Sequence, residues 1–123
     1  MSIQTIGIIG AGTMGNGIAQ ACATAGLRAI MVDISEAALQ KGLATISGSL
    51  ERLVKKEKIS AADKDAALSR IQTSTQYDAL QQAQIVIEAA TENYDIKVKI
   101  LQQVDKLVGP EVILASNTSS ISI

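Results

Sequence analysis

Apolar residues in this chain form short continuous runs, separated by stretches in which they recur every three or four positions. Short runs rich in Ile and Val are typical of strands buried in a parallel sheet, and the periodic stretches are typical of amphipathic helices. The runs predict strands at Ile6–Ile9, Arg28–Val32, Ile71–Thr75, Gln84–Glu88 and Val112–Ala115. The remaining stretches predict helices at Ile18–Ala23, from near Glu36 to about residue 57, at Ala61–Leu68, Asp78–Gln82 and Asp95–Val108.

This alternation of strands and helices predicts a doubly wound α/β fold of the Rossmann type, with a parallel sheet covered by helices on both faces. The expected strand order is 3-2-1-4-5, and ligands should bind at the switch point between strands 1 and 4, outside their carboxyl ends. Residues 1–123 are predicted to form one domain. The helical excursion between strands 2 and 3 is longer than a minimal crossover, so we expect it to have a further role.

Capping residues mark several of these boundaries. Ser35 and Ser60 precede the two helices of the excursion, where a hydroxyl can accept a hydrogen bond from the first turn. Gly26 follows the first helix, in a position that favours left-handed backbone.

Gly42 and Gly48 each weaken the long helix by up to about 1 kcal/mol relative to alanine. The apolar stripe of that helix consists of Leu39, Leu43, Ile46, Leu50 and Leu53.

A glycine-rich turn, Gly10-Ala11-Gly12-Thr13-Met14-Gly15, follows the first strand at once. In such a turn Gly10 allows the tight bend, Gly12 leaves room for a pyrophosphate, and Gly15 lets the helix pack closely on the strand. The helix start then offers backbone N–H groups and a positive dipole end to the phosphates. Glycine-rich turns are common, so this motif alone is weak evidence for a nucleotide site.

Asp33 makes the nucleotide hypothesis much stronger. It ends the second strand, about 20 residues beyond the glycines, where dinucleotide-binding units carry an acid for the adenosine ribose. An ordinary strand–turn–helix with an accidental aspartate would explain the same residues less well. Because a carboxylate repels a 2′-phosphate and neither Ile34 nor Ser35 supplies a cation, we expect NAD to be preferred over NADP.

Composition removes other classes of function. The chain has 123 residues, a net charge of -1, two tyrosines and no Phe or Trp, so it lacks the basic and aromatic surface that nucleic acids require. No apolar run approaches the roughly 20 residues of a membrane span. Cys22, the only cysteine, is expected to be a small core residue, and no thiol cluster could hold a metal. With the first strand so close to Met1, we expect no signal peptide and a cytoplasmic protein.

Three motifs together resemble the 3-hydroxyacyl-CoA dehydrogenase family, and most closely its bacterial 3-hydroxybutyryl-CoA members. They are Gly10–Ala19, which contains the glycine turn, Val86–Asn93 with the sequence VIEAATEN, and Ala115–Ser120 with the sequence ASNTSS. The resemblance spans the whole chain, including the helical excursion. It implies an enzyme that moves a hydride between NAD and C3 of a 3-hydroxyacyl-CoA.

The resemblance also implies a role for individual residues. The turn Gly10–Gly15, with Ala11, Thr13 and Met14 between its glycines, would hold the pyrophosphate, and Asp33 the ribose. The residues at the nicotinamide would be Glu92, Lys97 and Asn117. Ser119 would donate a hydrogen bond to the reacting oxygen of the substrate, and Ser49 and Lys56 would contact coenzyme A. For Lys56, a solvated lysine cluster with Lys55 and Lys58 explains the sequence almost equally well.

One departure from the family is large. The family's catalytic histidine and its orienting glutamate lie beyond the equivalent of Ile123, as does the helical substrate and dimerisation domain, and this chain has no histidine. We therefore expect a cofactor domain of a homodimeric enzyme, one that binds NAD without efficient turnover. Two alternatives stay open: a relative that acts on another hydroxy acid, and a stand-alone NAD-binding or sensing module.

Overall fold

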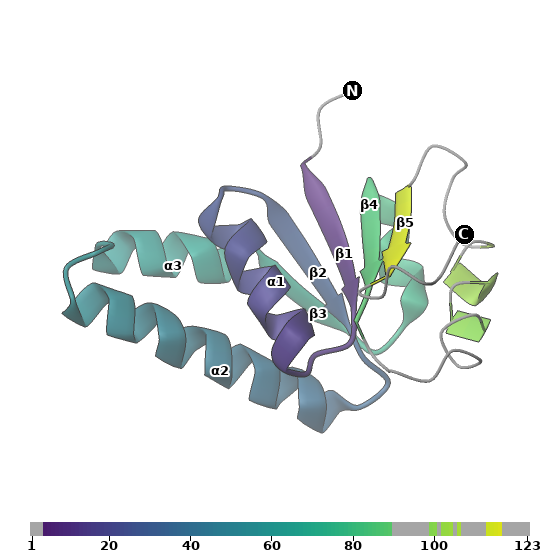
Figure 1. The fold of residues 1–123 in the computed structure, drawn as a ribbon, viewed down its shortest axis with the longest axis horizontal. Helices are drawn as coiled ribbons and strands as arrows, with labels where there is room; N and C mark the ends of the chain where they lie inside the picture. Colours follow the sequence, from purple (N-terminus) through teal and green to yellow (C-terminus); the bar gives the residue numbers. More distant parts are fainter. Residues whose placement is uncertain (1–3, 90–98, 101, 105, 107–112, 117–123) are drawn as a thin grey trace.

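A five-stranded parallel sheet forms the centre of the molecule in the computed structural model, which describes residues 4–89, 99–100, 102–104, 106 and 113–116 (Figure 1). Its strands are β1 (Thr5–Ile9), β2 (Arg28–Val32), β3 (Ile71–Ser74), β4 (Ile85–Glu88) and β5 (Ile113–Ser116). Their order is β3-β2-β1-β4-β5, and every neighbouring pair is parallel. The predicted strand order is confirmed, with β1 at the centre.

Within residues 4–89, three α-helices and one 3₁₀-helix accompany the strands. They are α1 (Thr13–Thr24), α2 (Glu36–Lys55), α3 (Ala61–Ser69) and the 3₁₀-helix η1 (Tyr77–Gln82). The helix predicted at Asp78–Gln82 is therefore a 3₁₀-helix that begins one residue earlier. Of the helix predicted over Asp95–Val108, residues 99–100 and 102–104 are helical, and most of the rest lies outside the described residues.

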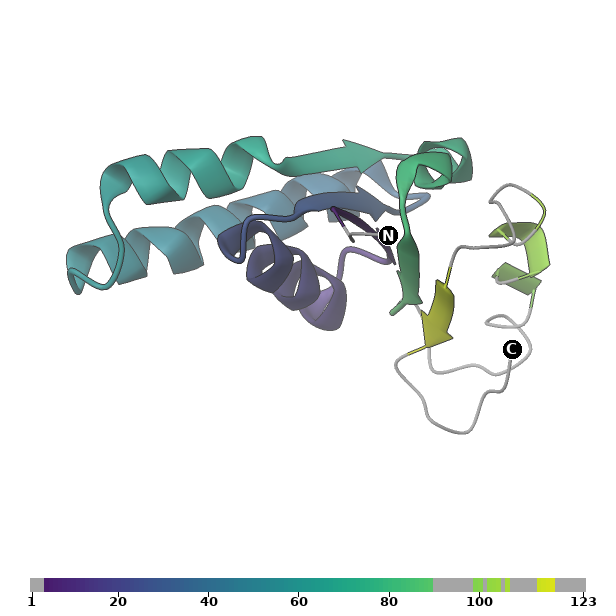
Figure 2. The same cartoon turned by 90° about the horizontal axis from the view of Figure 1, so that it is seen from above.

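Two apolar cores lie on opposite faces of the sheet. The larger core joins Ile6 and Ile8 of β1 to buried residues of α1, α2 and α3, among them Leu39, Ile46 and Leu50. The smaller one joins Ile9, Ile30, Val32 and Val86 to Leu80 and Val104 on the other side. Seen from above, α1, α2 and α3 cover one face, while η1 and the segment around residue 104 flank the other (Figure 2). Helices on both faces explain why the central strands β1, β2 and β4 are mainly apolar, whereas the edge strand β3 is mostly polar.

The predicted caps determine where the helices of the excursion begin. The Ser35 hydroxyl accepts a hydrogen bond of 3.1 Å from the backbone N of Ala38. Ser60 and Asp63 form a reciprocal capping box, with hydrogen bonds of 3.0 and 3.1 Å between each side chain and the other residue's backbone N. Gly26 has a φ of 94°, which confirms the left-handed position predicted after α1.

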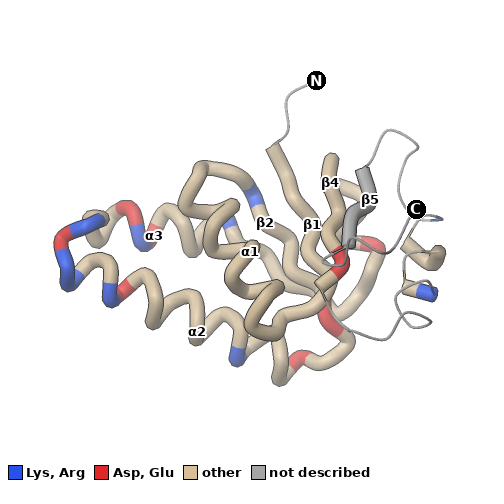
Figure 3. The backbone as a smooth tube through the Cα atoms, viewed as in Figure 1, with Lys and Arg blue, Asp and Glu red and all other residues tan. Residues whose placement is uncertain are grey.

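The hairpin of α2 and α3 extends well beyond the sheet, so the excursion is a projecting arm (Figures 1 and 2). The turn between the helices includes Glu57, whose φ is 61°. The end of α2 and the turn after it contain Lys55, Lys56 and Lys58. Blue basic positions gather at this tip, with red acidic positions among them (Figure 3). Farther along the hairpin, Lys64 of α3 forms an ion pair of 2.8 Å with Glu51 of α2.

Candidate functional site

The carboxyl ends of β1, β2, β4 and β5 lie at one edge of the sheet, which we call the rim. The backbone N of Gly10 donates to the Val32 carbonyl at 2.7 Å, so the glycine turn is joined to the end of β2. The backbone N of Ala89 donates to the Ile9 carbonyl at 2.8 Å, and Ser116 pairs in register with Glu88. The turn, Asp33 and the ends of β4 and β5 therefore meet, as predicted.

The first and last glycines of the turn are required by the path of the backbone. Gly10 has a φ of 108°, which residues with a side chain rarely adopt. A Cβ added to Gly15 would overlap the carbonyl oxygen of Gly10 and lie 2.8 Å from its carbonyl carbon. The start of α1 can therefore approach the end of β1 only because residue 15 has no side chain.

Gly12 differs from its neighbours because a Cβ there would meet nothing within 4 Å. It is the N-cap of α1, and no side chain of the described residues caps that helix. The first N–H groups of an α-helix have no intrahelical acceptor, and the helix dipole is positive at this end. Bare backbone, open space and N–H groups are what a pyrophosphate needs, so the residues present fit the phosphates of a dinucleotide.

Asp33 is bonded to the backbone on both sides. Its Oδ2 accepts from the backbone N of Ala11 at 3.0 Å, and its Oδ1 accepts from the backbone N of Ser35 at 2.9 Å. The half-buried carboxylate thus joins the glycine turn to the beginning of α2. Its orientation is fixed beside the turn, at the place where a dinucleotide-binding unit holds the adenosine ribose.

Glu88 and Tyr77 are rim residues that the sequence analysis did not single out. Glu88 ends β4 and is fully buried. Burial raises the pKa of Tyr77, and the nearby carboxylates of Asp33 and Glu88 raise it further. Glu88 could have been found from the sequence, because it is an acid at the carboxyl end of an otherwise apolar strand. Asp33 and Glu88 therefore place two acidic residues at the rim, near the phenol of Tyr77.

Comparison with known proteins identifies this arrangement. The family model described as the 3-hydroxyacyl-CoA dehydrogenase NAD binding domain matches residues 5–123. The chain belongs to this family. It is therefore an NAD-binding domain.

Relatives of this NAD-binding domain include a 3-hydroxybutyryl-CoA dehydrogenase of Bradyrhizobium diazoefficiens, 45% identical over 98% of this chain and 41% of that protein. The crystal structure of (S)-3-hydroxybutyryl-CoA dehydrogenase from Ralstonia eutropha is 69% identical, with a TM-score of 0.95 over 99% of this chain and 43% of that one. A structure named 3-hydroxybutyryl-CoA dehydrogenase from Escherichia coli is 37% identical, with a TM-score of 0.95 over 100% of this chain and 26% of that one. The chain spans less than half the length of these relatives.

Two predicted coenzyme A residues of the NAD-binding domain lie on α2 or at its end. The Ser49 hydroxyl accepts a hydrogen bond of 3.0 Å from Gln20 Nε2 of α1. Gln20 also lines a groove of about 490 Å³ between the two helices, together with Gly17, Ala21, Thr24, Ala25 and Leu53. Lys56 is exposed at the C-terminal end of α2, beyond this groove. The other predicted cofactor and substrate residues, Glu92, Lys97, Asn117 and Ser119, lie outside the described residues.

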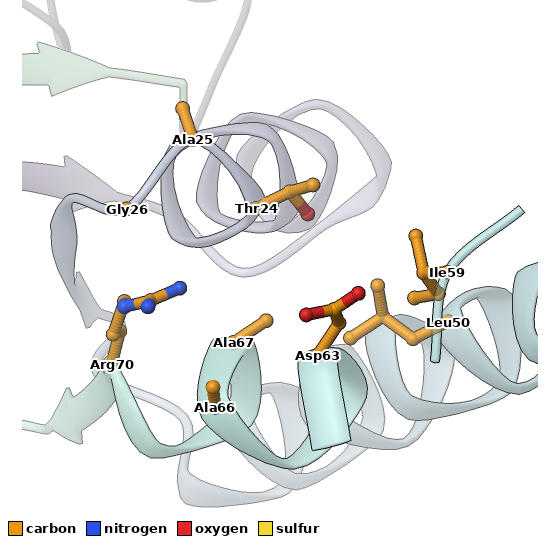
Figure 4. A pocket seen from close by; sticks show the side chains of 9 residues that line it. All are labelled: Thr24, Ala25, Gly26, Leu50, Ile59, Asp63, Ala66, Ala67 and Arg70. Atoms are coloured by element: carbon orange, nitrogen blue, oxygen red, sulfur yellow. The ribbon is translucent and has the colours of Figure 1, made fainter. Parts of the chain in front are cut away.

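A second cavity of the domain lies at the opposite, amino edge of the sheet, between α1 and α3 (Figure 4). It has a volume of about 330 Å³, and Arg70 and Asp63 face it from two sides. Both charged groups are already bonded: Arg70 Nη1 donates to the Ala23 carbonyl at 2.8 Å, and Asp63 belongs to the α3 capping box.

Among the described residues, no helix has the length and hydropathy of a membrane-spanning segment.

Proposed function

We propose that the protein containing this chain is an NAD-dependent dehydrogenase that interconverts 3-hydroxyacyl-CoA and 3-oxoacyl-CoA, with 3-hydroxybutyryl-CoA as its substrate. One observation carries the proposal: a glycine turn with open backbone at Gly12 lies against Asp33, within a family whose domain binds NAD. The similarity to proteins named 3-hydroxybutyryl-CoA dehydrogenase supports the choice of substrate. The family resemblance further supports a cytoplasmic homodimer.

In this proposal the residues of the domain bind and orient the cofactor. The turn Gly10–Gly15 and the start of α1 donate backbone hydrogen bonds to the pyrophosphate, and Asp33 accepts hydrogen bonds from the adenosine ribose. When bound, NAD supplies the acceptor for the hydride. We assign Glu92, Lys97 and Asn117 to the nicotinamide side. Ser119 donates a hydrogen bond to the reacting oxygen of the substrate.

The groove between α1 and α2 supports the second part of the proposal, that coenzyme A binds along this face. Ser49 is held beside the groove by Gln20, and Leu53 contributes an apolar wall one turn farther along α2. Lys56 follows Leu53 by three positions, so a chain-like ligand that fills the groove can reach its ammonium group. An ammonium is a good point-charge partner for the phosphates of coenzyme A.

An assay of hydride transfer tests the proposed activity. The full-length enzyme should oxidise NADH when supplied with acetoacetyl-CoA, and should use NADPH poorly because Asp33 repels a 2′-phosphate. The 123-residue chain should bind NAD but turn over far more slowly, since it has no histidine. Loss of a general base alone typically costs about 100- to 10,000-fold. Turnover by the 123-residue chain at the rate of the full-length enzyme would contradict this assignment of the catalytic group.

Lys56→Glu tests the proposed coenzyme A site. In the full-length enzyme we expect the KM for acetoacetyl-CoA to rise by about tenfold, because a charge pair with phosphate becomes a repulsion. The KM for NADH should stay within about twofold, since the rim is not touched.

Lys58→Glu is the matched control, because it makes the same charge reversal in the same turn. It should change the KM for acetoacetyl-CoA much less. If both variants behave alike, the tip contributes only a diffuse positive field and the proposed contact of Lys56 is wrong.

A further inference from the structure

The two glycines within α2 have very different surroundings. A Cβ added to Gly48 would meet nothing within 4 Å. A Cβ added to Gly42 would lie 2.9 Å from the carbonyl oxygen of Ala11 and 3.3 Å from Cε of Met31. Gly42 is also buried, whereas Gly48 is half-buried. The absence of a side chain is therefore required at Gly42 and not at Gly48, although both lower the intrinsic helix propensity.

The residue that Gly42 contacts is the centre of the glycine turn. Ala11 is 3% exposed, and its backbone N donates to Asp33 Oδ2 at 3.0 Å. Its carbonyl faces Gly42 across a distance at which even a methyl group would not fit. Ala11 is thus held at both of its backbone groups: its N–H by the Asp33 carboxylate, and its carbonyl by the close approach of α2 at Gly42. Gly12, which leaves open space for the pyrophosphate, follows immediately.

A side chain at residue 42 would displace the turn more readily than it would displace α2. Leu39 and Ile46 lie on the same face of α2 as Gly42, one turn before and one turn after it, and both are fully buried. Withdrawal of the helix would expose both residues and strain the Ser35 cap at its start. The turn lies at the edge of the sheet, so its peptides can shift at a smaller cost.

We propose that Gly42 is a positioning residue for NAD: it lets α2 approach the Ala11 carbonyl and thereby holds the phosphate-binding turn in its binding geometry. The inference rests on the assignment of this turn to NAD. It gives the start of the helical excursion a role in cofactor binding. Displacement of the Ala11 carbonyl moves the N–H groups that follow it and the bond to Asp33, so cofactor affinity should fall.

Calorimetric titration of Gly42→Ala with NAD and with ADP-ribose tests the proposal. We expect both ligands to bind about tenfold more weakly or worse, because a misplaced binding group costs affinity even when every group is present. Since ADP-ribose carries the pyrophosphate without the nicotinamide, equal losses place the effect at the turn. Circular dichroism and a cooperative thermal transition must show that the variant is folded.

Gly48→Ala is the matched control, since it makes the same substitution in the same helix where space is open. It should raise the thermal midpoint and leave both affinities within about twofold. If Gly42→Ala is poorly folded, the same measurements are made in the Gly48→Ala background. The proposal is overturned if Gly42→Ala binds both ligands normally, or if its affinity falls for NAD and not for ADP-ribose. It is also overturned if Gly48→Ala lowers the affinities equally, or if Gly42→Ala does not fold in either background. Failure of the parent protein to bind NAD would instead reject the proposed function.

Discussion

The two edges of the sheet carry opposite kinds of site. At the amino edge, α1 and α3 surround a cavity of about 330 Å³, yet the charged groups that face it are bonded within the protein, Arg70 to Ala23 and Asp63 to Ser60 (Figure 4). At the rim, a turn of bare backbone ends in a helix without a side-chain cap. The cavity at the amino edge is therefore faced by charged groups that already bond the protein, whereas the rim presents helix N–H groups that no side chain of the described residues caps.

This difference shows that a cavity and a binding site are separate properties. Arg70 bonds the part-buried carbonyl of Ala23 at the end of α1, and Asp63 caps the exposed start of α3. At the rim, no side chain of the described residues caps the first N–H groups of α1, and the Asp33 carboxylate bonds the turn at Ala11. The variants below separate stability from binding at the two edges.

Gly12→Ala and Gly15→Ala should give the largest and most different effects. Gly15→Ala places a methyl group on the Gly10 carbonyl, so we expect it to lower the free energy of unfolding by about 3 kcal/mol or more. Gly12→Ala meets open space in the protein and should stay folded. It should nevertheless bind NAD about 100-fold more weakly, because its methyl group occupies the space of the pyrophosphate. Urea unfolding and calorimetric titration measure the two effects.

The pair of glycine variants would contradict the assigned site if Gly12→Ala bound NAD like the parent protein. Gly17→Ala is the control for the Gly12 variant, because a Cβ at Gly17 also meets nothing within 4 Å but lies one turn farther along α1. It should leave the NAD affinity unchanged within about twofold.

Arg70→Met should affect the amino edge alone. Loss of the guanidinium leaves the Ala23 carbonyl without this donor, which should lower the free energy of unfolding by about 1.5–3 kcal/mol. The NAD affinity should stay within about twofold, because the cavity is at the other edge. Arg28→Met is the control, since the exposed Arg28 side chain donates to the Gln72 side chain at 3.1 Å, and its loss should cost about 0.5 kcal/mol or less. A clear loss of NAD affinity in Arg70→Met would contradict the claim that the amino edge serves stability and the rim serves binding.

Tyr77→Phe should give the smallest effect, confined to alkaline pH. Burial and the Asp33 and Glu88 carboxylates raise the pKa of the Tyr77 phenol in the folded state. The unfolded protein therefore loses that proton first, from about pH 10, and the free energy of unfolding falls as the pH rises through the folded pKa. Tyr77→Phe removes this term, so unfolding measured in urea between about pH 8 and 11 should show a shallower decline than in the parent. Equal slopes would mean that the pKa of Tyr77 is not raised in the folded state.

The sequence was sufficient to predict the parts of the fold that depend on local patterns. Ser35 and Ser60 were predicted as caps because their chemistry acts within one turn, and Gly26 because its conformation is a property of the residue itself. The strand order followed from alternation and the handedness of crossovers. At the rim, the glycine turn and Asp33 were predicted because their spacing belongs to a known mechanism.

Features that depend on contacts between distant segments could not be predicted. Gly42 and Gly48 read alike in the sequence, and only the approach of α2 to Ala11 separates them. The same holds for Gly7, where a Cβ would lie 2.5 Å from Cδ2 of Leu80, so η1 packs against bare backbone of β1. Glu88 ends a strand whose pattern predicts burial, but a pattern does not identify the group that a buried carboxylate meets. The predicted roles of Glu92, Lys97, Asn117 and Ser119 stay predictions.

The place of β1 at the centre of the sheet determines the order in which the sheet can assemble during synthesis. Strand β1 pairs on one side with β2, and on the other with β4, which emerges from the ribosome far later. The Gln84 carboxamide oxygen, which accepts from the backbone N of Gln4 at 3.1 Å and of Thr5 at 2.8 Å, belongs to the same late segment. Until then, an apolar strand has one open edge while β3, β2 and β1 can already assemble. We therefore expect the nascent chain to be most exposed to misfolding before β4 appears, because the open edge of β1 is unpaired until then.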